Sequence, residues 1–348
     1  MSTTNPRRRL LAIGGALAAA ALTLTACTNS SDDGDNDNAA NAGAGDNAET
    51  GETVRIGFSA PAADHGWMGA ITDAAVDQAG AFDDVELVHA EGTNDVNLQI
   101  SQVETFINDK VDAIVLLPFD GAAMTDVATR AMEAGIPVIN VDREFDSPFA
   151  ARTTVLGDNY GMGVSAGSYV CEQADGNTDA IVAEIAGIDS LPLTQDRSRG
   201  FKDALADCGL KVSNRVAAEF TVETGERAAA NLLQAAPKID FLWNHDDDQG
   251  VGVLAAIENA GRDEFVMIGG AGSANVMRSI EADDTVLKAT VIYPSTQGAD
   301  GIKLARLIAQ GRSMSDLAEV EVPRVVQLAA PTVTKENVDQ YVDSAFES

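Results

Sequence analysis

From Val54 onward, short runs of β-branched and other apolar residues alternate with segments of helical length. The run VRIGFSA predicts a strand, and the segment after it carries apolar residues at helical spacing. We predict strands over 54–60, 85–92, 112–119, 135–143, 179–187, 211–220, 239–246 and 265–272. We predict helices over 65–80, 98–110, 124–135, 160–174, 198–209, 225–237 and 249–261. This alternation predicts an α/β fold of doubly wound parallel sheets with helices on both faces.

The alternation runs through two similar halves. KVDAIVLLPFDG and KIDFLWNHDDDQG occupy equivalent places in them, as do GIPVINVD and EFVMIGGAG. About 295 residues follow position 52, which exceeds what one hydrophobic core usually supports, so we expect two domains. Ligands bind beyond the carboxyl ends of parallel strands, so the informative side chains are expected directly after the strands.

The N-terminal region has the features of an export signal. Arg7, Arg8 and Arg9 form a cationic start, and the apolar stretch from Leu10 to Leu24 is short for a membrane span. Ala26 then precedes Cys27, an order that resembles a bacterial lipoprotein signal in which 1–26 are removed and Cys27 is acylated. A plain N-terminal anchor, or a secretory signal in which Cys27 is incidental, are the alternatives. The arginines suit either the general or the twin-arginine export route.

Charge and composition narrow the function further. Without residues 1–26 the chain has 20 basic and 54 acidic side chains, a net charge of −34. So acidic a surface repels phosphate backbones, which disfavours nucleic acid as a partner. Residues 27–52 lack large apolar side chains, and we expect them to form a disordered tether. No later segment has the uninterrupted apolar length that a membrane span needs.

Two cysteines remain once Cys27 is set aside. In an exported protein, Cys171 and Cys208 either form a disulfide or stay as two buried thiols. Residue types and spacing leave both alternatives open.

Candidate ligand-binding residues follow the predicted strands. His65 and Trp67 come after the first strand, where an indole ring can stack on the apolar face of a sugar while polar neighbours bind hydroxyls. Asp142 and Arg143 end another strand and together offer a hydroxyl acceptor and a forked donor. The alternatives are a tryptophan packed in the core and an exposed ion pair.

The second half offers two further candidate clusters. Arg197 and Arg199 open a helix, and either one of them faces a cleft or both are solvated. The run from His245 to Asp248 suggests a metal, but it has the ligand spacing of neither an EF-hand nor a zinc protease. Consecutive residues on such a turn point in different directions, and acidic groups there also suit a helix N-terminus. We therefore expect no metal.

Enzyme chemistry has little support. The chain has 3 histidines and no nucleophile elbow, Walker A loop or dinucleotide fingerprint in the right place. The glycine cluster at 269–273 lacks the second spacing that a dinucleotide loop needs. We expect no catalytic residues and no cofactor.

An ordered series of motifs carries a family resemblance. The pieces are VRIGFS, DAIVLLP, GIPVINVDR, the R-x-x-G-F element that begins at Arg197, the AEF that ends at Phe220, NHDDDQGVG and the ATV that ends at Val291. From Thr53 almost to its C-terminus, the chain resembles the type I periplasmic binding proteins of the ribose-binding type, the sugar-capturing subunits of ABC importers. The resemblance implies two lobes joined by a three-strand hinge, a ligand held between them, a monomer and a permease partner.

The resemblance also implies a set of ligand-binding residues. In this sequence they are His65, Trp67, Met68, Asp142, Arg143, Arg197, Phe220, Asp246 and Tyr293. Two positions depart from the family pattern. Ala271 stands where the family has an acid, and Tyr293 stands where it has a glutamine. These changes put ribose itself in doubt and make another pentose, a hexose or a sugar alcohol equally suitable, since an unpaired buried polar group is costly.

The resemblance places three chain crossings between the lobes, near 154–158, 293–297 and 322–326. The N-terminal lobe would then hold 53–155 and 294–323, and the C-terminal lobe 156–293 and 324–348. With the lipid on Cys27, the protein would sit on the outer face of the cytoplasmic membrane, in the cell envelope.

Three rival functions use the same residues. A sensor that presents a sugar or small signal molecule to a membrane receptor would need the same cleft. A sugar-responsive repressor is disfavoured by the acidic charge, the export signal and the lack of a helix-turn-helix before Thr53. A hydrolase using Asp142 and Asp246 as acid and base is disfavoured by the family resemblance.

Overall fold

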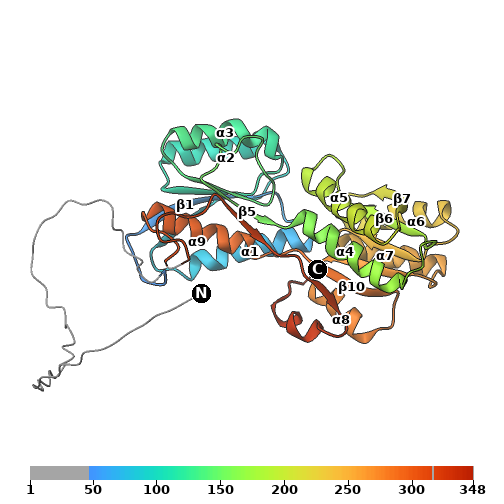
Figure 1. The fold of residues 1–348 in the computed structure, drawn as a ribbon. Helices are drawn as coiled ribbons and strands as arrows, with labels where there is room; N and C mark the ends of the chain where they lie inside the picture. Colours follow the sequence, from blue (N-terminus) through green and yellow to red (C-terminus); the bar gives the residue numbers. More distant parts are fainter. Residues whose placement is uncertain (1–46, 316, 348) are drawn as a thin grey trace, which may run out of the picture. The chain divides into compact units, whose positions relative to one another are not determined.

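The first lobe is built on a fully parallel sheet. The computed structural model describes residues 47–315 and 317–347, and its first sheet has the order β11-β5-β4-β3-β1-β2. Its strands are β1 (Val54–Ser59), β2 (Val85–His89), β3 (Ala113–Leu116), β4 (Val138–Val141), β5 (Thr153–Gly157) and β11 (Val325–Leu328). Helices α1 (Gly66–Gly80) and α9 (Gln297–Ala309) cover one face, and α2 (Val96–Asp109) and α3 (Gly121–Glu133) cover the other (Figure 1).

The second lobe repeats this plan with one difference. Its sheet has the order β12-β10-β9-β8-β6-β7, in which only β12 runs antiparallel to its neighbour. The strands are β6 (Val182–Ala186), β7 (Val212–Ala217), β8 (Phe241–Asn244), β9 (Val266–Ala271), β10 (Leu287–Ile292) and β12 (Thr332–Thr334). The helices are α4 (Asn159–Ala174), α5 (Pro192–Asp207), α6 (Val222–Ala235), α7 (Asp247–Ala260) and α8 (Ala274–Ala282). The predicted α/β fold of two doubly wound sheets is confirmed.

Burial explains why the central strands form. In β3, β4 and β8 every residue is buried, as expected for strands that helices cover on both faces. Side-chain caps then start several of the helices that follow: Asp120 accepts from an amide of α3, and Thr221 accepts from one of α6. These caps fix each strand-end loop to the first turn of the helix that follows. The side chains of the loops are thereby positioned.

The chain crosses between the sheets three times, and the third crossing lies later than we predicted. The first two follow β5 and β10, close to the expected positions. For the third, we assigned 324–348 to the C-terminal lobe, but β11 pairs with β5 in the first sheet. The crossing therefore lies at 329–331, between β11 and β12. The apolar pair Val325 and Val326 extends the parallel ladder of β5 before the chain leaves the lobe.

The predicted tether is too long at its C-terminal end. Residues 47–52 lie against the first lobe, where the guanidinium of Arg306 donates to the backbone carbonyls of Asn47 (2.8 Å) and Glu49 (2.6 Å). Gln310 donates to the carbonyl of Glu52 (2.8 Å), and the Gly51 amide donates to Asp84 (2.5 Å). These bonds to backbone groups hold the segment although it has no large apolar side chain to bury. The rest of the expected tether, Cys27 and the signal lie outside the described residues.

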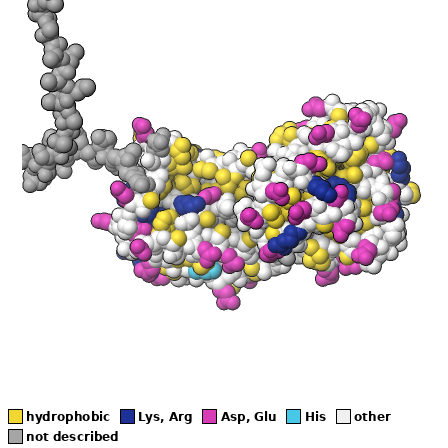
Figure 2. All heavy atoms as spheres, turned by 90° about the horizontal axis from the view of Figure 1, so that it is seen from below, with side chains coloured by type: hydrophobic (Ala, Val, Ile, Leu, Met, Phe, Trp, Pro, Cys, Tyr) yellow, Lys and Arg dark blue, Asp and Glu magenta, His cyan; other side chains and the backbone are white. Residues whose placement is uncertain are grey.

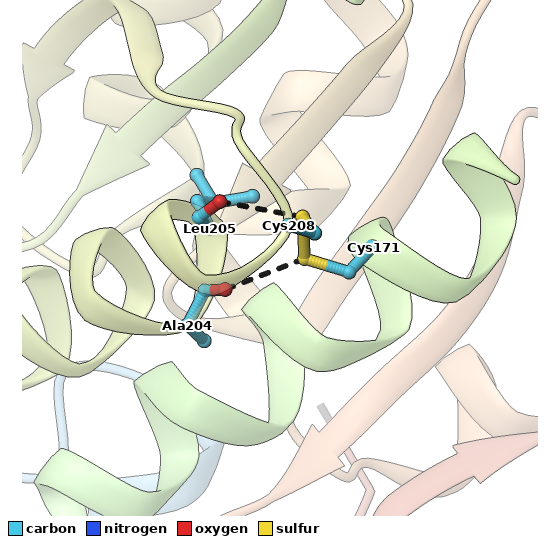
Figure 3. The surroundings of a disulfide bond; sticks show 4 residues. All are labelled: Cys171, Ala204, Leu205 and Cys208. Carbon is cyan, nitrogen blue, oxygen red and sulfur yellow. Dashed lines mark hydrogen bonds between the residues drawn. A yellow bond between two sulfur atoms is a disulfide. The ribbon is translucent and has the colours of Figure 1, made fainter. Parts of the chain in front are cut away.

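Cys171 and Cys208 form a disulfide in the structure, which settles the alternatives that the sequence left open (Figure 3). The bond joins the last part of α4 to the residue directly after α5. Each sulfur also lies against a backbone carbonyl of α5, at 3.4 Å from Ala204 and 3.3 Å from Leu205. The bond thus ties together α4 and α5, the two helices that pack most extensively in this lobe.

Removing this disulfide is expected to destabilise the protein by about 2–4 kcal/mol. The closed loop spans 37 residues, and in the chain-entropy description such a cross-link restricts the unfolded chain by this amount. The measurement is urea unfolding of the double variant Cys171→Ala/Cys208→Ala beside the wild type. Coincident unfolding midpoints for the two proteins would contradict the prediction.

Acidic side chains predominate among the charged groups of the protein. Figure 2 shows one face, on which Asp and Glu side chains are spread widely and Lys and Arg are sparse. Within residues 47–315 and 317–347, no helix has the length and apolar character that crossing a membrane requires.

Candidate functional site

The predicted ligand-binding side chains line one cavity. It is small, about 20 Å³ in volume, and lies where the carboxyl ends of strands from both sheets meet. Its walls are His65, Trp67, Met68, Asp142, Arg143, Leu193, Arg197, Phe220, Asp246, Ala271 and Tyr293. A cavity of this size holds about one water, so a sugar fits only when the lobes lie further apart.

Trp67 forms the first-lobe wall and also reaches the second lobe. It lies in the first turn of α1, and its backbone amide donates to Asp248 of α7 (3.1 Å). Its indole nitrogen donates to the backbone carbonyl of Tyr293 (3.0 Å), so the ring, and not its N–H, is offered to the cavity. Nearby, the ring of His65 lies 6.5 Å from that of Phe220, again from the opposite lobe. The two lobes therefore touch across the cleft.

Asp142 and Arg143 follow β4 and supply an acceptor and a donor. Asp142 is buried and accepts from the hydroxyl of Tyr293 (2.5 Å). The Nε of Arg143 is 3.8 Å from the second oxygen of Asp142. Arg143 is held in turn by its bond to the carbonyl of Phe119 (2.7 Å). This pair is not the exposed ion pair of the alternative interpretation.

Arg197 is the arginine of α5 that enters the cavity. It is buried, whereas the side chain of Arg199 is 58% exposed and pairs with Asp196 on the surface. Arg197 donates to Asn159 (2.8 Å) and to the backbone carbonyl of His245 (3.2 Å). Neither bond uses Nη2, and the guanidinium carbon lies 4.4 Å from the ring centre of Tyr293. These contacts fix a buried cation at the wall of the cavity.

The acidic run after β8 points in three directions, as expected for a turn. Asp246 lines the cavity and caps α7 through the Gln249 amide (3.0 Å). Asp247 turns to the end of β9 and to β10, where it accepts from the amides of Gly270, Gly272 and Ser273 and from the hydroxyls of Ser273 and Thr290. Asp248 bonds Trp67 across the cleft. Among the described residues, no three His, Cys, Asp or Glu side chains are grouped to hold a metal.

Burial dominates the acid–base behaviour of these carboxyls. It raises the pKa of Asp246 to about 7, an effect that His65 opposes and the nearby Asp248 reinforces. Burial likewise raises the pKa of Asp247 to about 7, and its several hydrogen-bond donors oppose that rise. Asp246 at the cavity therefore holds a proton over much of the acidic range.

Three cavity residues have left-handed backbone conformations. Asp142 has φ 64°, Phe220 has φ 65° and Ala271 has φ 97°, although none is glycine. Such conformations are costly for residues with a Cβ and cluster at sites where function demands a particular side-chain direction. Each of the three ends or follows a strand, so the strained loops aim side chains into the cleft. This strain supports the assignment of the cavity as the functional site.

A buried charged network supports the second-lobe wall. His245 and Glu184 are fully buried, with the imidazole Nε2 3.1 Å from the carboxylate, and Ser198 also bonds Glu184. Burial alone would raise the pKa of Glu184, but His245, Ser198 and Arg215 lower it to about 2. Burial lowers the pKa of His245. Because the carbonyl of His245 holds Arg197, this network fixes the backbone on which the cavity arginine rests.

Replacing Asp246 by asparagine is expected to flatten the dependence of stability on pH between about 4 and 7. The native carboxyl keeps its proton up to about pH 7, whereas the unfolded one, with a pKa of 3.8, releases it earlier. The native state thus binds more protons in this window, and stability falls as pH rises, by up to a few kcal/mol. Asparagine retains the cap of α7. Parallel curves for variant and wild type in urea unfolding across this window would contradict the prediction.

Three residues of the site were missed by sequence analysis. Leu193 lines the cavity, Asn159 links Arg197 to Tyr293, and Asp248 joins α7 to Trp67. Leu193 carried no polar signal, and Asn159 and Asp248 act through partners distant in sequence. Asp248 lay within the acidic run that we noted, but nothing local indicated its partner.

Comparisons with known proteins agree with this geometry. Residues 56–313 match the family described as periplasmic binding protein domain. A ribose import binding protein of Bacillus subtilis is 31% identical over 225 residues, covering 63% of this chain and 72% of that protein. A xylitol-binding protein of Mycolicibacterium smegmatis is 26% identical over 308 residues, covering 86% and 83%. A solute binding protein from Bacillus halodurans, solved with bound myo-inositol, is 26% identical with a TM-score of 0.74, covering 85% and 99%.

Proposed function

This chain belongs to the periplasmic binding protein domain family, and we propose on that premise that it captures a small neutral sugar or sugar alcohol between its lobes. The observation that carries the proposal is the convergence of polar and aromatic side chains from both lobes on one cavity. The family consists of substrate-binding proteins of transporters and not of enzymes. The proposed role is accordingly binding and delivery without chemical change.

The chemistry of the cavity fits a polyol. Asp142 accepts hydroxyl protons, Arg143 and Arg197 donate to hydroxyl or ring oxygens, and Trp67 and Phe220 offer aromatic surface to the apolar face of a sugar. The relatives named above bind ribose, xylitol and myo-inositol, which are all neutral and rich in hydroxyls. A carboxylate and guanidinium pair with aromatic walls suits the same class of ligand here.

We propose that ligand binding drives closure of the lobes. A ligand shifts an equilibrium between open and closed forms only through its differential affinity for the two. One lobe supplies Trp67, Asp142 and Arg143, and the other supplies Arg197, Phe220 and Asp246. A ligand that bonds both sets stabilises the closed form, which ABC permease subunits would then recognise. The protein is proposed to act as a monomer on the outer face of the cytoplasmic membrane.

The test of ligand class is a thermal-shift panel of pentoses, hexoses and polyols. The protein is the chain from residue 27 with Cys27→Ser, which retains the segment at 47–52 that Arg306 holds. A ligand at 100 times its dissociation constant is expected to stabilise the native state by about 2.7 kcal/mol. Failure of every neutral sugar and polyol, with stabilisation by charged metabolites instead, would contradict the proposed ligand class.

Membrane attachment is proposed to depend on the thiol of Cys27. In cells, the Cys27→Ser variant is expected to appear in the soluble extracytoplasmic fraction, because it has no sulfur to acylate. The wild type should stay with the membrane and incorporate labelled palmitate. Equal membrane association of both proteins would indicate an uncleaved N-terminal anchor instead.

A further inference from the structure

Tyr293 occupies the hinge end of the cavity, directly after β10. Its side chain is buried, and its hydroxyl donates to Asp142 (2.5 Å) and accepts from the amide of Asn159 (3.1 Å). Asn159 accepts in turn from Arg197 (2.8 Å). A continuous hydrogen-bond chain therefore runs from the first lobe through the hinge to the second lobe.

The ring of Tyr293 is closely packed on several sides. Gly157, at the end of β5, lies so close that a Cβ there would come within 2.1 Å of the ring. On the other side the guanidinium carbon of Arg197 is 4.4 Å from the ring centre, and the ring of Trp67 is 5.3 Å away. The backbone carbonyl of Tyr293 also takes the indole N–H of Trp67. Tyr293 thus acts as a fixed wall.

The position of Tyr293 limits both the space and the hydrogen-bond acceptors that the cavity presents to a ligand. One oxygen of Asp142 accepts from the phenol and the other lies 3.8 Å from Nε of Arg143, so fewer of its lone pairs remain for ligand hydroxyls. The ring also fills volume at the hinge end, and only about 20 Å³ stays open between the lobes. A ligand that extends toward the hinge would have to displace a satisfied hydrogen bond and a packed ring.

We propose that Tyr293 determines the size specificity of the site, so that it takes five-carbon polyols and sugars in preference to their six-carbon homologues. The proposal rests on the proposed function and names the part of the ligand class that the cavity selects. The phenol takes the place of the outermost hydroxymethyl group of a longer ligand, both in the space it fills and in the bond it makes to Asp142.

The experiment compares chain-length preference in the wild type and two hinge variants. Calorimetry gives dissociation constants for a panel of pentitols, hexitols, pentoses and hexoses, and the ratio of the best six-carbon to the best five-carbon ligand is compared. Tyr293→Ala opens the hinge end, and it is expected to move this ratio toward six carbons by about tenfold or more, the discrimination that one extra carbon supports in a shaped pocket. Tyr293→Phe keeps the ring but loses the bond to Asp142, so it should move the ratio less than Tyr293→Ala does.

The outcomes separate this inference from the proposed function. A wild type that binds six-carbon ligands as tightly as five-carbon ones, or an unchanged ratio in Tyr293→Ala, overturns the size role and leaves the proposed function intact. A wild type that binds no sugar or polyol overturns both. If Tyr293→Ala does not fold, Tyr293→Gln provides the smaller side chain with a polar end, and the same shift in ratio is expected.

Discussion

Replacing Arg197 by alanine is expected to weaken binding of the best ligand by at least about 100-fold. Hydrogen bonds to a charged group contribute about 1.5–3 kcal/mol each, and a guanidinium fork can donate more than one to a polyol. The substitution also removes the bonds to Asn159 and to the carbonyl of His245 that link the second lobe to the hinge. Calorimetry against the ligand found in the panel measures the effect.

The matched control lies two residues away on the same helix. Arg199 is exposed, pairs with Asp196 and lies over the ring of Tyr160. Arg199→Ala removes the same charge from α5 without touching the cavity, so affinity should change by less than about threefold. If Arg197→Ala binds as tightly as Arg199→Ala, Arg197 is not part of the ligand site.

Replacing Arg306 by alanine is expected to destabilise the protein by about 3–5 kcal/mol. Arg306 and Asp84 are each 2% exposed, and the guanidinium makes two bonds of 2.6 Å to the carboxylate. Hydrogen bonds from Arg306 hold the pKa of Asp84 well below its usual range. Without Arg306 the carboxylate stays buried without its cation, the situation in which loss of one partner costs most. Urea unfolding measures the loss.

Lys303 provides the control for Arg306. It lies on the same helix, its side chain is 47% exposed, and it pairs with Asp300 one turn away. Lys303→Ala should change stability by less than about 1 kcal/mol. The Arg306→Ala variant should also release residues 47–52, which proteolysis would detect as earlier cleavage before Val54. Equal stability of the two variants would show that the buried pair contributes no more than a surface pair.

The elements themselves were largely predictable because their signals are local. Each strand and helix that we predicted from apolar runs and helical spacing is present, with ends that differ by up to six residues, as at the start of α5. The elements that we did not predict include β5, α8, α9 and β12. β11 is an edge strand whose residues alternate between exposed and half-buried, so no fully buried run marked it. Its membership in the first sheet depends on pairing with β5, far away in the chain.

The site residues that directly follow strands were predictable from the sequence. Trp67, Asp142 and Asp246 each follow a strand, and parallel strands bring such positions to one edge. Which arginine of α5 enters the cavity was not predictable from the sequence, because Arg197 and Arg199 differ only in the side of the helix they occupy. The role of Asp248 depends on Trp67, 181 residues away, and no local rule indicates that pairing.

The sequence by itself determined the α/β alternation, the acidic surface and the positions from which ligand groups project, because these depend on residue type and short-range spacing. The tertiary structure alone decided the disulfide, the ordering of 47–52 by Arg306 and the placement of Tyr293 against Asp142. Each of these contacts joins segments far apart in the chain. The free energy of such a contact depends on burial and on which partners the fold brings within bonding distance, and neither can be read from neighbouring residues.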